Sequence, residues 1–181
     1  MMKRVLLLLA LGASTAPALR AAGPADAIRM RPLVRDGQVF VTFELAGGLT
    51  DEVRETIRSG LPTTFVYEFE LRRGVPLWID RTLAVTTVTA TVQYDNLTRR
   101  HQLSRTIDGR VEPAEVTESD SVAERWLTSF ERLPLFSTND LEANVEYYVR
   151  VRAQARPRST WSLWPWASGG ASGHTRFTFL P

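Results

Sequence analysis

The chain contains no cysteine, one lysine (Lys3) and two histidines among its 181 residues. Without cysteine it can form no disulfide, carry no lipid anchor on a cysteine, and offer no thiol nucleophile or thiolate metal ligand. The sequence also lacks an H-E-x-x-H pair, a G-x-S-x-G elbow, a phosphate-binding P-loop and a dinucleotide fingerprint. We therefore expect a protein that is not an enzyme and that holds no cofactor.

The N-terminus has the features of a secretory signal peptide. Lys3 and Arg4 precede an apolar run over residues 5–13, which is shorter than the roughly 20 residues that a membrane-spanning helix needs. Ala18 and Ala27 each end an A-x-A cleavage pattern. We predict a signal peptide over residues 1–18, with residue 27 as the alternative end, and export to the periplasm or cell envelope.

The net charge of +2 comes entirely from Lys3 and Arg4, so the rest of the chain is close to neutral. This balance excludes nucleic acid as an expected partner, because nucleic-acid-binding domains are strongly basic. The remaining length suits one domain with a core large enough to fold without disulfides. We expect this single domain to span residues 28–181.

Apolar and polar residues alternate along most of that domain, which is typical of strands with one buried face. The clearest segments are Gln38–Leu45, Thr63–Arg72 and Asn144–Arg156; in Arg81–Tyr94 the alternation slips, which predicts a bulge near Thr86 and Thr87. The pairs Asp36-Gly37, Asp95-Asn96 and Asp108-Gly109 mark hairpin turns. The pattern predicts a mainly β fold: an antiparallel β-sandwich of about seven strands, immunoglobulin-like or related, with two short helices. The predicted core contains Phe43, Phe65, Phe69, Tyr147 and Val149.

Two segments have helical spacing. Thr50–Ser59 has acidic residues in its first turn, and Gly60 and Pro62 follow its end. Its apolar stripe consists of Leu49, Val53, Ile57 and Leu61. The second predicted helix begins with a capping box between Ser121 and Glu124, continues through an apolar stripe, and ends at Pro134. The stripe consists of Val122, Trp126, Phe130 and Leu133.

Two stretches carry a family resemblance: Ser-Gly-Leu-Pro-Thr-Thr-Phe at 59–65 with Tyr-Glu-Phe-Glu-Leu-Arg-Arg at 67–73, and Tyr-Asp-Asn-Leu-Thr-Arg-Arg at 94–100. With the N-terminal signal, they make the chain resemble a family of exported bacterial proteins known only as a domain of unknown function. The resemblance implies no catalytic residues. It implies a role in the cell envelope, with a membrane sensor kinase as a possible kind of partner.

The strongest binding candidate is the Trp/Gly-rich loop over residues 157–174. It contains Trp161, Trp164 and Trp166, and it follows a row of arginines formed by Arg150, Arg152, Arg156 and Arg158. Tryptophan and arginine are enriched in binding hot spots. We expect a non-catalytic envelope module that docks a protein partner or an anionic membrane surface here. The alternatives are a carbohydrate- or lipid-binding sandwich, tryptophans that only plug the fold, arginines paired with neighbouring glutamates, and a hydrolase.

Other polar clusters have simpler interpretations. His101 shares a strand face with apolar residues, which favours a half-buried structural histidine. Glu68 and Glu70 could mimic a glycosidase pair, but cross-strand ion pairs are the preferred interpretation. The segment from Asp108 to Glu146 carries ten acids against three arginines. Within it, Glu115, Glu118 and Asp120 lack the spacing of a calcium loop, so we expect a solvated acidic loop.

Overall fold

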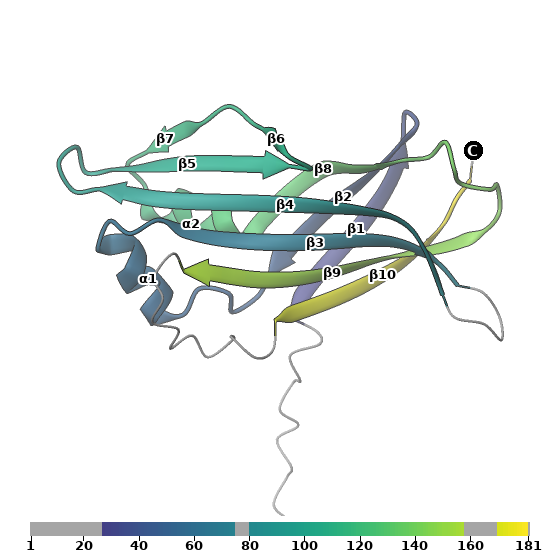
Figure 1. Cartoon of the computed structure of the whole chain (residues 1–181), viewed down its shortest axis with the longest axis horizontal. Helices are drawn as coiled ribbons and strands as arrows, with labels where there is room; N and C mark the ends of the chain where they lie inside the picture. Colours follow the sequence, from purple (N-terminus) through teal and green to yellow (C-terminus); the bar gives the residue numbers. More distant parts are fainter. Residues whose placement is uncertain (1–26, 75–79, 158–169, 181) are drawn as a thin grey trace, which may run out of the picture.

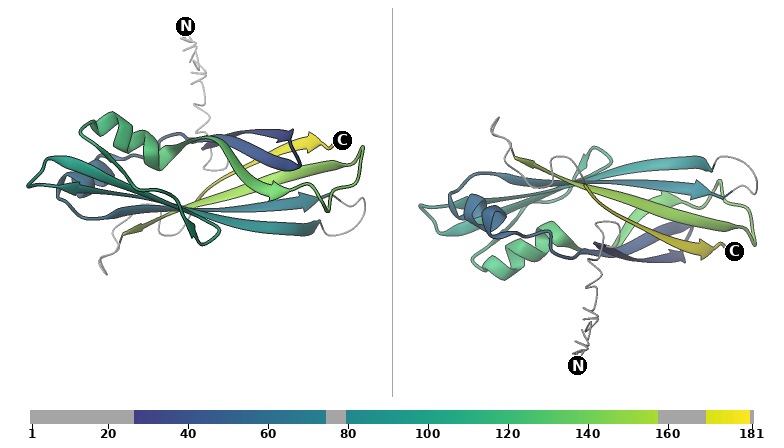
Figure 2. Two further views of the ribbon diagram at one scale, coloured as in Figure 1. Left: turned by 90° about the horizontal axis from the view of Figure 1, so that it is seen from above. Right: turned by 90° about the horizontal axis from the view of Figure 1, so that it is seen from below.

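Two antiparallel sheets pack face to face in a computed structural model that describes residues 27–74, 80–157 and 170–180, without the side chains of 155–157. The smaller sheet has the strand order β1-β2-β8, and the larger one has the order β10-β9-β3-β4-β5-β6, with β7 also paired to β5. Seen edge-on, α2 lies in the same layer as the smaller sheet (Figure 2). The predicted antiparallel sandwich with two helices is confirmed.

The elements follow in the order β1, β2, α1, β3, β4, β5, β6, β7, α2, β8, β9 and β10. Their bounds are β1 Ile28–Arg35, β2 Gln38–Leu45, α1 Asp51–Arg58, β3 Thr63–Arg73, β4 Arg81–Asp95, β5 Arg100–Ile107, β6 Arg110–Val111, β7 Glu115–Thr117, α2 Asp120–Thr128, β8 Ser129–Ser137, β9 Glu146–Pro157 and β10 Ala171–Thr178.

The predicted hairpin turns lie where the sequence placed them. Asp36 and Gly37 have φ values of 50° and 73°, and Asp108 and Gly109 have 47° and 79°. Positive φ at both central residues defines the type I′ turn, whose twist matches that of paired strands. Between β4 and β5, the Asp95 carboxylate accepts hydrogen bonds from the backbone N–H groups of the turn that follows. These turns explain the uninterrupted hairpins β1–β2, β4–β5 and β5–β6.

Helix α1 also confirms its prediction. The Thr50 hydroxyl accepts a hydrogen bond from the Val53 amide (3.4 Å), and Gly60 follows the helix with φ of 82°. Val53 and Ile57 are buried, whereas Leu61, the last residue of the predicted stripe, is 54% exposed. The apolar face of the helix therefore ends one turn earlier than the spacing suggested.

An aromatic cluster fills the centre of the sandwich. The Phe43 ring lies 4.9 Å from that of Tyr67, 5.1 Å from that of Phe69 and 4.4 Å from that of Phe130, measured between centroids. All five residues of the predicted core are buried. The Tyr67 hydroxyl donates a 2.5 Å hydrogen bond to the Leu127 carbonyl, and burial raises the pKa of this phenol, so it stays protonated as a donor. The cluster joins β2, β3 and β8.

The bulge in β4 lies earlier than predicted. Leu71 pairs with Ala84 and Arg72 pairs with Thr82, so Leu83 is the extra residue. The prediction at Thr86 and Thr87 was wrong because Thr86, although polar, is an inward-facing residue of the regular strand. It is buried, and its hydroxyl donates to the Leu135 carbonyl (2.9 Å). The alternation of apolar and polar residues along β4 is interrupted because a threonine occupies a core position.

The second helix is shorter than predicted, and a strand replaces its second half. Helix α2 is preceded by Ser119 rather than Ser121, the Ser119 side chain makes no capping hydrogen bond to the helix backbone, and the helix ends at Thr128. Phe130 and Leu133 belong to β8, which also contains Pro134. Since β8 is an edge strand, proline does not disrupt a ladder on its outer side. Arg132, with φ of 46°, bends the strand. Proline therefore marks an edge strand here, not a helix end.

The two lateral sides of the sandwich differ: one is closed by contact between the sheets, and the other is open. On one side β1 packs beside β10, so closely that a Cβ on Gly173 would lie 2.6 Å from the Ile28 carbonyl oxygen. On the other side the edge strands β8 and β5–β7 are connected by α2, and the layers stay apart. Within the described ranges, no helix is long and apolar enough to cross a membrane.

Candidate functional site

The open side of the sandwich contains a hollow of about 300 Å³, which we call the seam pocket. Its charged lining comes from β5, the segment between β6 and β7, the first residue of β7, and β8: Arg105, Glu112, Glu115, Glu131 and Arg132. Its apolar lining consists of Ile107, Pro113, Trp126, Leu133 and Pro134. Ligand pockets range from about 300 to 1,000 Å³, so this pocket has room for one or two side chains.

Arg105 is the central polar residue of the seam pocket. Its guanidinium carbon lies 4.1 Å from the ring centroid of Trp126 and 4.1 Å from that of Phe130, which is the geometry of two cation–π contacts. Nη2 donates to the Trp126 carbonyl (3.3 Å), while the buried Nε has no acceptor among the described residues. Burial lowers the pKa of this guanidinium, and Glu115 and Glu112 partly counteract that effect. The aromatic rings hold the side chain in one orientation with unused donor capacity.

The local sequence explains why Arg105 takes this place. Along β5 the inward-facing positions are His101, Leu103, Arg105 and Ile107, and the cross-strand neighbour of Arg105 is the small residue Ala90. The Trp126 indole N–H donates to the Ser104 carbonyl (3.1 Å), which fixes the ring above the strand. Arg105 was not among the site residues predicted from the sequence. The available signal was an arginine in an inward-facing position of an alternating strand.

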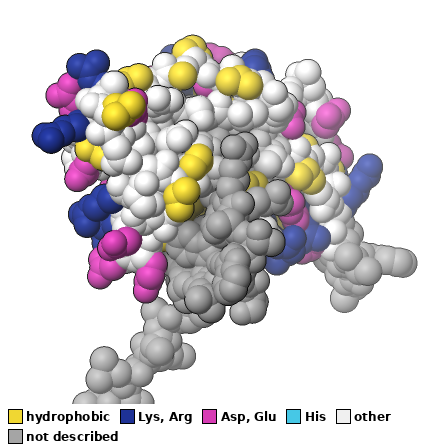
Figure 3. Space-filling view, turned by 60° about the vertical axis from the view of Figure 1, so that its left-hand side comes forward, with side chains coloured by type: hydrophobic (Ala, Val, Ile, Leu, Met, Phe, Trp, Pro, Cys, Tyr) yellow, Lys and Arg dark blue, Asp and Glu magenta, His cyan; other side chains and the backbone are white. Residues whose placement is uncertain are grey.

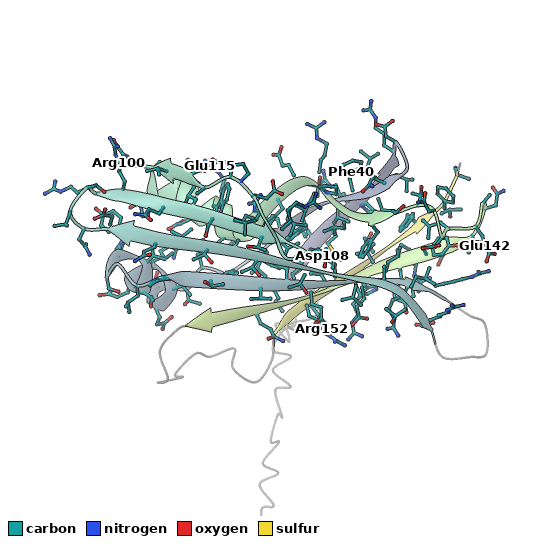
Figure 4. All side chains as sticks on the ribbon, turned by 45° about the horizontal axis from the view of Figure 1, so that its top comes forward. Phe40, Arg100, Asp108, Glu115, Glu142 and Arg152 are labelled. Carbon is teal, nitrogen blue, oxygen red and sulfur yellow. The ribbon has the colours of Figure 1, made fainter. Side chains whose placement is uncertain are left out.

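Three carboxylates that line the seam pocket have no cation partner within the described ranges. Figure 4 labels Glu115 at the β5–β7 edge and Arg152 nearer β9 and β10, so the two lie on different parts of the larger sheet. No ion pair of Glu112, Glu115 or Glu131 is found in the described part of the chain. By contrast, Glu118 pairs with Arg100 at 3.0 Å.

The predicted arginine row is only partly described. Arg152 lies 3.6 Å from Glu68 and 3.4 Å from Glu70, and Arg72 lies 3.7 Å from Glu70, all on the outer face of the larger sheet. These contacts confirm the interpretation of Glu68 and Glu70 as cross-strand ion-pair residues. Arg150 is half-buried on the same strand face. Figure 3 shows basic and acidic side chains interspersed around the outline of its view rather than gathered into one basic patch.

The remaining predicted binding residues cannot be placed. Trp161, Trp164, Trp166 and Arg158 lie outside the described residues, as does most of the predicted 157–174 loop, and Arg156 is described only by its backbone in β9. The residues of the predicted signal peptide also lie outside them. The hypothesis that the tryptophans form an interface therefore stays a prediction.

His101 is a structural residue, more deeply buried than predicted. It is 3% exposed, its Nε2 lies 2.8 Å from an Asp120 carboxylate oxygen, and its ring lies 4.8 Å from that of Tyr94. The hydrogen bond connects β5 to the first residue of α2. Asp120 therefore has a structural hydrogen bond that Glu115 lacks within the described ranges. No group of three or more potential metal ligands is found across those ranges.

Comparison with known protein families gives one match to this chain. A family model described as Domain of unknown function (DUF4390) matches residues 24–159. The chain belongs to this family. No curated protein and no solved structure matches it. The match includes every residue of the seam pocket, whereas Trp161, Trp164 and Trp166 lie beyond its end. In this DUF4390 domain the pocket is thus part of the family region, and the tryptophan cluster is not.

Proposed function

We propose that this DUF4390 domain is a non-catalytic binding module of the cell envelope that docks a protein partner at the seam pocket. The observation that carries the proposal is Arg105, which is held between two aromatic rings at a pocket, with a buried Nε that lacks an acceptor. Aromatic and arginine side chains dominate binding hot spots, and oriented guanidinium groups suit the recognition of carbonyl and carboxylate oxygens. The size of the pocket suits side chains of a partner rather than a large cofactor.

The surroundings of the pocket support docking at this side. The opposite side of the sandwich is occupied by the contact between β1 and β10. The outer face near β9 carries arginines whose charge is partly neutralised by Glu68 and Glu70. The seam pocket, its exposed carboxylates and its aromatic wall therefore lie together at one edge of the sandwich. Among the residues that the structure describes, no comparable feature supports a hydrolase or a sugar-binding function.

We expect export to be accompanied by cleavage after Ala18 rather than Ala27. The Ala27 carbonyl accepts a hydrogen bond from the Ala46 amide (2.8 Å), and Ile28 is 5% exposed. Cleavage after Ala27 would remove this acceptor and place a charged amino group on a buried residue, which is costly. N-terminal sequencing of the protein from an envelope fraction should therefore begin at Leu19. A chain that begins at Met1 contradicts export by a cleaved signal.

Site-specific photo-cross-linking in cells tests the docking proposal. A benzophenone amino acid replaces Pro113, which is exposed and lines the seam pocket, or Thr87, which is exposed on the outer face of β4. We expect a discrete protein adduct from position 113 and none from position 87. Mass spectrometry of the adduct then identifies the partner.

The proposal is wrong if position 113 gives no adduct under conditions where the domain is folded and exported. It is also wrong if both positions give the same adducts, because such a result indicates random collisions. Adducts that contain lipid or polysaccharide, but no protein, would contradict a protein partner.

A further inference from the structure

The acid-rich segment from Asp108 to Glu146 divides into paired and unpaired carboxylates. Four of its ten acids pair with an arginine, and a fifth forms a hydrogen bond with a histidine: Glu118 with Arg100, Glu124 with Arg54, Glu142 with Arg73, Glu146 with Arg176, and Asp120 with His101. The other five have no such partner within the described ranges: Asp108, Glu112, Glu115, Glu131 and Asp140. Three of these five line the seam pocket. Unpaired acids therefore gather at a hollow that has an aromatic wall.

The rim of the seam pocket carries a net negative charge. Glu115, Glu131 and Arg132 are exposed and Glu112 is half-buried, which gives three negative charges against one positive charge at the opening. Arg105 adds its charge deeper in, against the rings of Trp126 and Phe130. A ligand that approaches from solvent meets the carboxylates first. Complementary charge at such a rim steers a cationic partner and disfavours an anionic one.

We propose that the seam pocket binds a basic, amphipathic segment of the partner protein, with an arginine or lysine head between the rim glutamates and an adjacent apolar side chain on the pocket wall. This inference rests on the proposed function and adds the chemistry of the bound segment. The wall residues Ile107, Leu133 and Pro134 supply the apolar surface. Aliphatic stems of basic side chains pack well on such surfaces while their heads stay in water.

Three features distinguish a peptide from other cations. No cluster of three or more carboxylates and histidines close enough to hold a metal ion is found in the described part of the chain, so the rim glutamates suit a guanidinium or ammonium group. The guanidinium of Arg105, a residue that lines the pocket, suits an acceptor, and a peptide carries a carbonyl at every residue. Arg105 would repel a simple polycation, which offers no such acceptor.

The bound segment is recognised by its side chains and isolated carbonyls rather than as an added strand. Pro134 has no N–H to donate, Arg132 has a left-handed backbone, and the Leu135 carbonyl already accepts a hydrogen bond from Thr86. A continuous ladder along β8 is thus interrupted. Specificity then depends on charge, which predicts a strong dependence on the identity of the basic residues.

Peptide binding to the mature protein tests this chemistry. The probes are blocked, fluorescently labelled peptides with a Val-Arg-Leu-Arg centre, and the same peptides with both arginines replaced by glutamine or by glutamate. Fluorescence anisotropy should show the arginine peptide binding at least about tenfold more tightly than the glutamine peptide. The glutamate peptide should not bind. Raising the ionic strength should weaken the arginine complex, because salt screens exposed charges.

Charge reversal provides the control. The variant Glu115→Arg/Glu131→Arg should lose the arginine peptide and acquire affinity for the glutamate peptide. The matched variant Glu55→Arg/Asp140→Arg makes the same change in net charge at exposed positions of α1 and of the turn that follows β8, outside the pocket lining, and should bind as the wild type does. Both variants should keep the wild-type melting temperature, since all four side chains are exposed.

Three results would overturn the inference: no preference of the wild type for arginine over glutamine, including no binding of either probe; equal loss of binding in both double variants; and displacement of the peptide by spermidine at equal affinity. If these occur while position 113 still cross-links a protein, docking at the seam stands and only the basic chemistry fails. If position 113 gives no adduct, the proposed function itself fails.

Discussion

Replacing Phe69 with alanine should lower the free energy of unfolding by about 3–5 kcal/mol, since it removes a buried aromatic ring and leaves a cavity. Phe69 is fully buried, and its ring meets that of Phe43 edge-on at a centroid distance of 5.1 Å. Its cross-strand neighbours are Thr86 and Val151, so the cavity would open at the centre of the larger sheet. A denaturant titration of the mature domain measures the change.

The matched control is Val85→Ala, on the opposite face of β4. Val85 is 52% exposed, so its truncation should cost less than about 1 kcal/mol. A loss of about 1 kcal/mol or less for Phe69→Ala would show that the two layers are not packed at this point. Since domains are stable by only about 5–15 kcal/mol, the expected loss would remove a large share of the total stability.

Replacing Gly173 with alanine should destabilise the domain by about 1–3 kcal/mol, because the added methyl group overpacks the closed side of the sandwich. The new Cβ would lie 2.6 Å from the Ile28 carbonyl oxygen and 3.0 Å from the Ile28 Cβ. The first of these atoms belongs to the backbone of β1, so the strands themselves must separate. The change is measured as a lower denaturation midpoint and as faster amide exchange in β1.

The neighbouring exposed residue supplies the comparison. His174 follows Gly173 on β10 but faces solvent, and it pairs in register with Arg150. His174→Ala should leave both the denaturation midpoint and the amide exchange of β1 close to wild type. If Gly173→Ala were equally silent, the close approach of β1 and β10 would not exist in solution.

The sequence was sufficient to predict most strands of the larger sheet, because these strands alternate regularly. It also predicts the Asp-Gly turn of one hairpin in each sheet, because these residues accept positive φ. Thr63–Arg73 and Glu146–Pro157 were predicted within one or two residues of their observed ends. Asp36-Gly37 and Asp108-Gly109 were recognised as turns because an Asp-Gly pair tolerates the left-handed backbone that a two-residue hairpin requires. In these segments the backbone conformation that the local residues favour is also the one that the tertiary structure requires.

Prediction failed where long-range packing overrides local pattern. Trp126, Phe130 and Leu133 have helical spacing, yet the last two lie in β8, where pairing with β2 and a bend at Arg132 decide the conformation. Because the first half of β8 has helical spacing, the sequence does not predict the open side of the sandwich or its pocket. Arg105 was missed for the same reason, since its aromatic neighbours come from α2 and β8.

Pro134 has a consequence for behaviour at high concentration. Uncovered edge strands offer unpaired amides to a second molecule and thereby promote fibre growth. On β8 the missing N–H of Pro134 and the left-handed turn at Arg132 leave no continuous row of donors for an incoming strand. The carboxylates beside them add repulsion between identical copies. The open side of the sandwich is therefore poorly suited to templating aggregation of the protein.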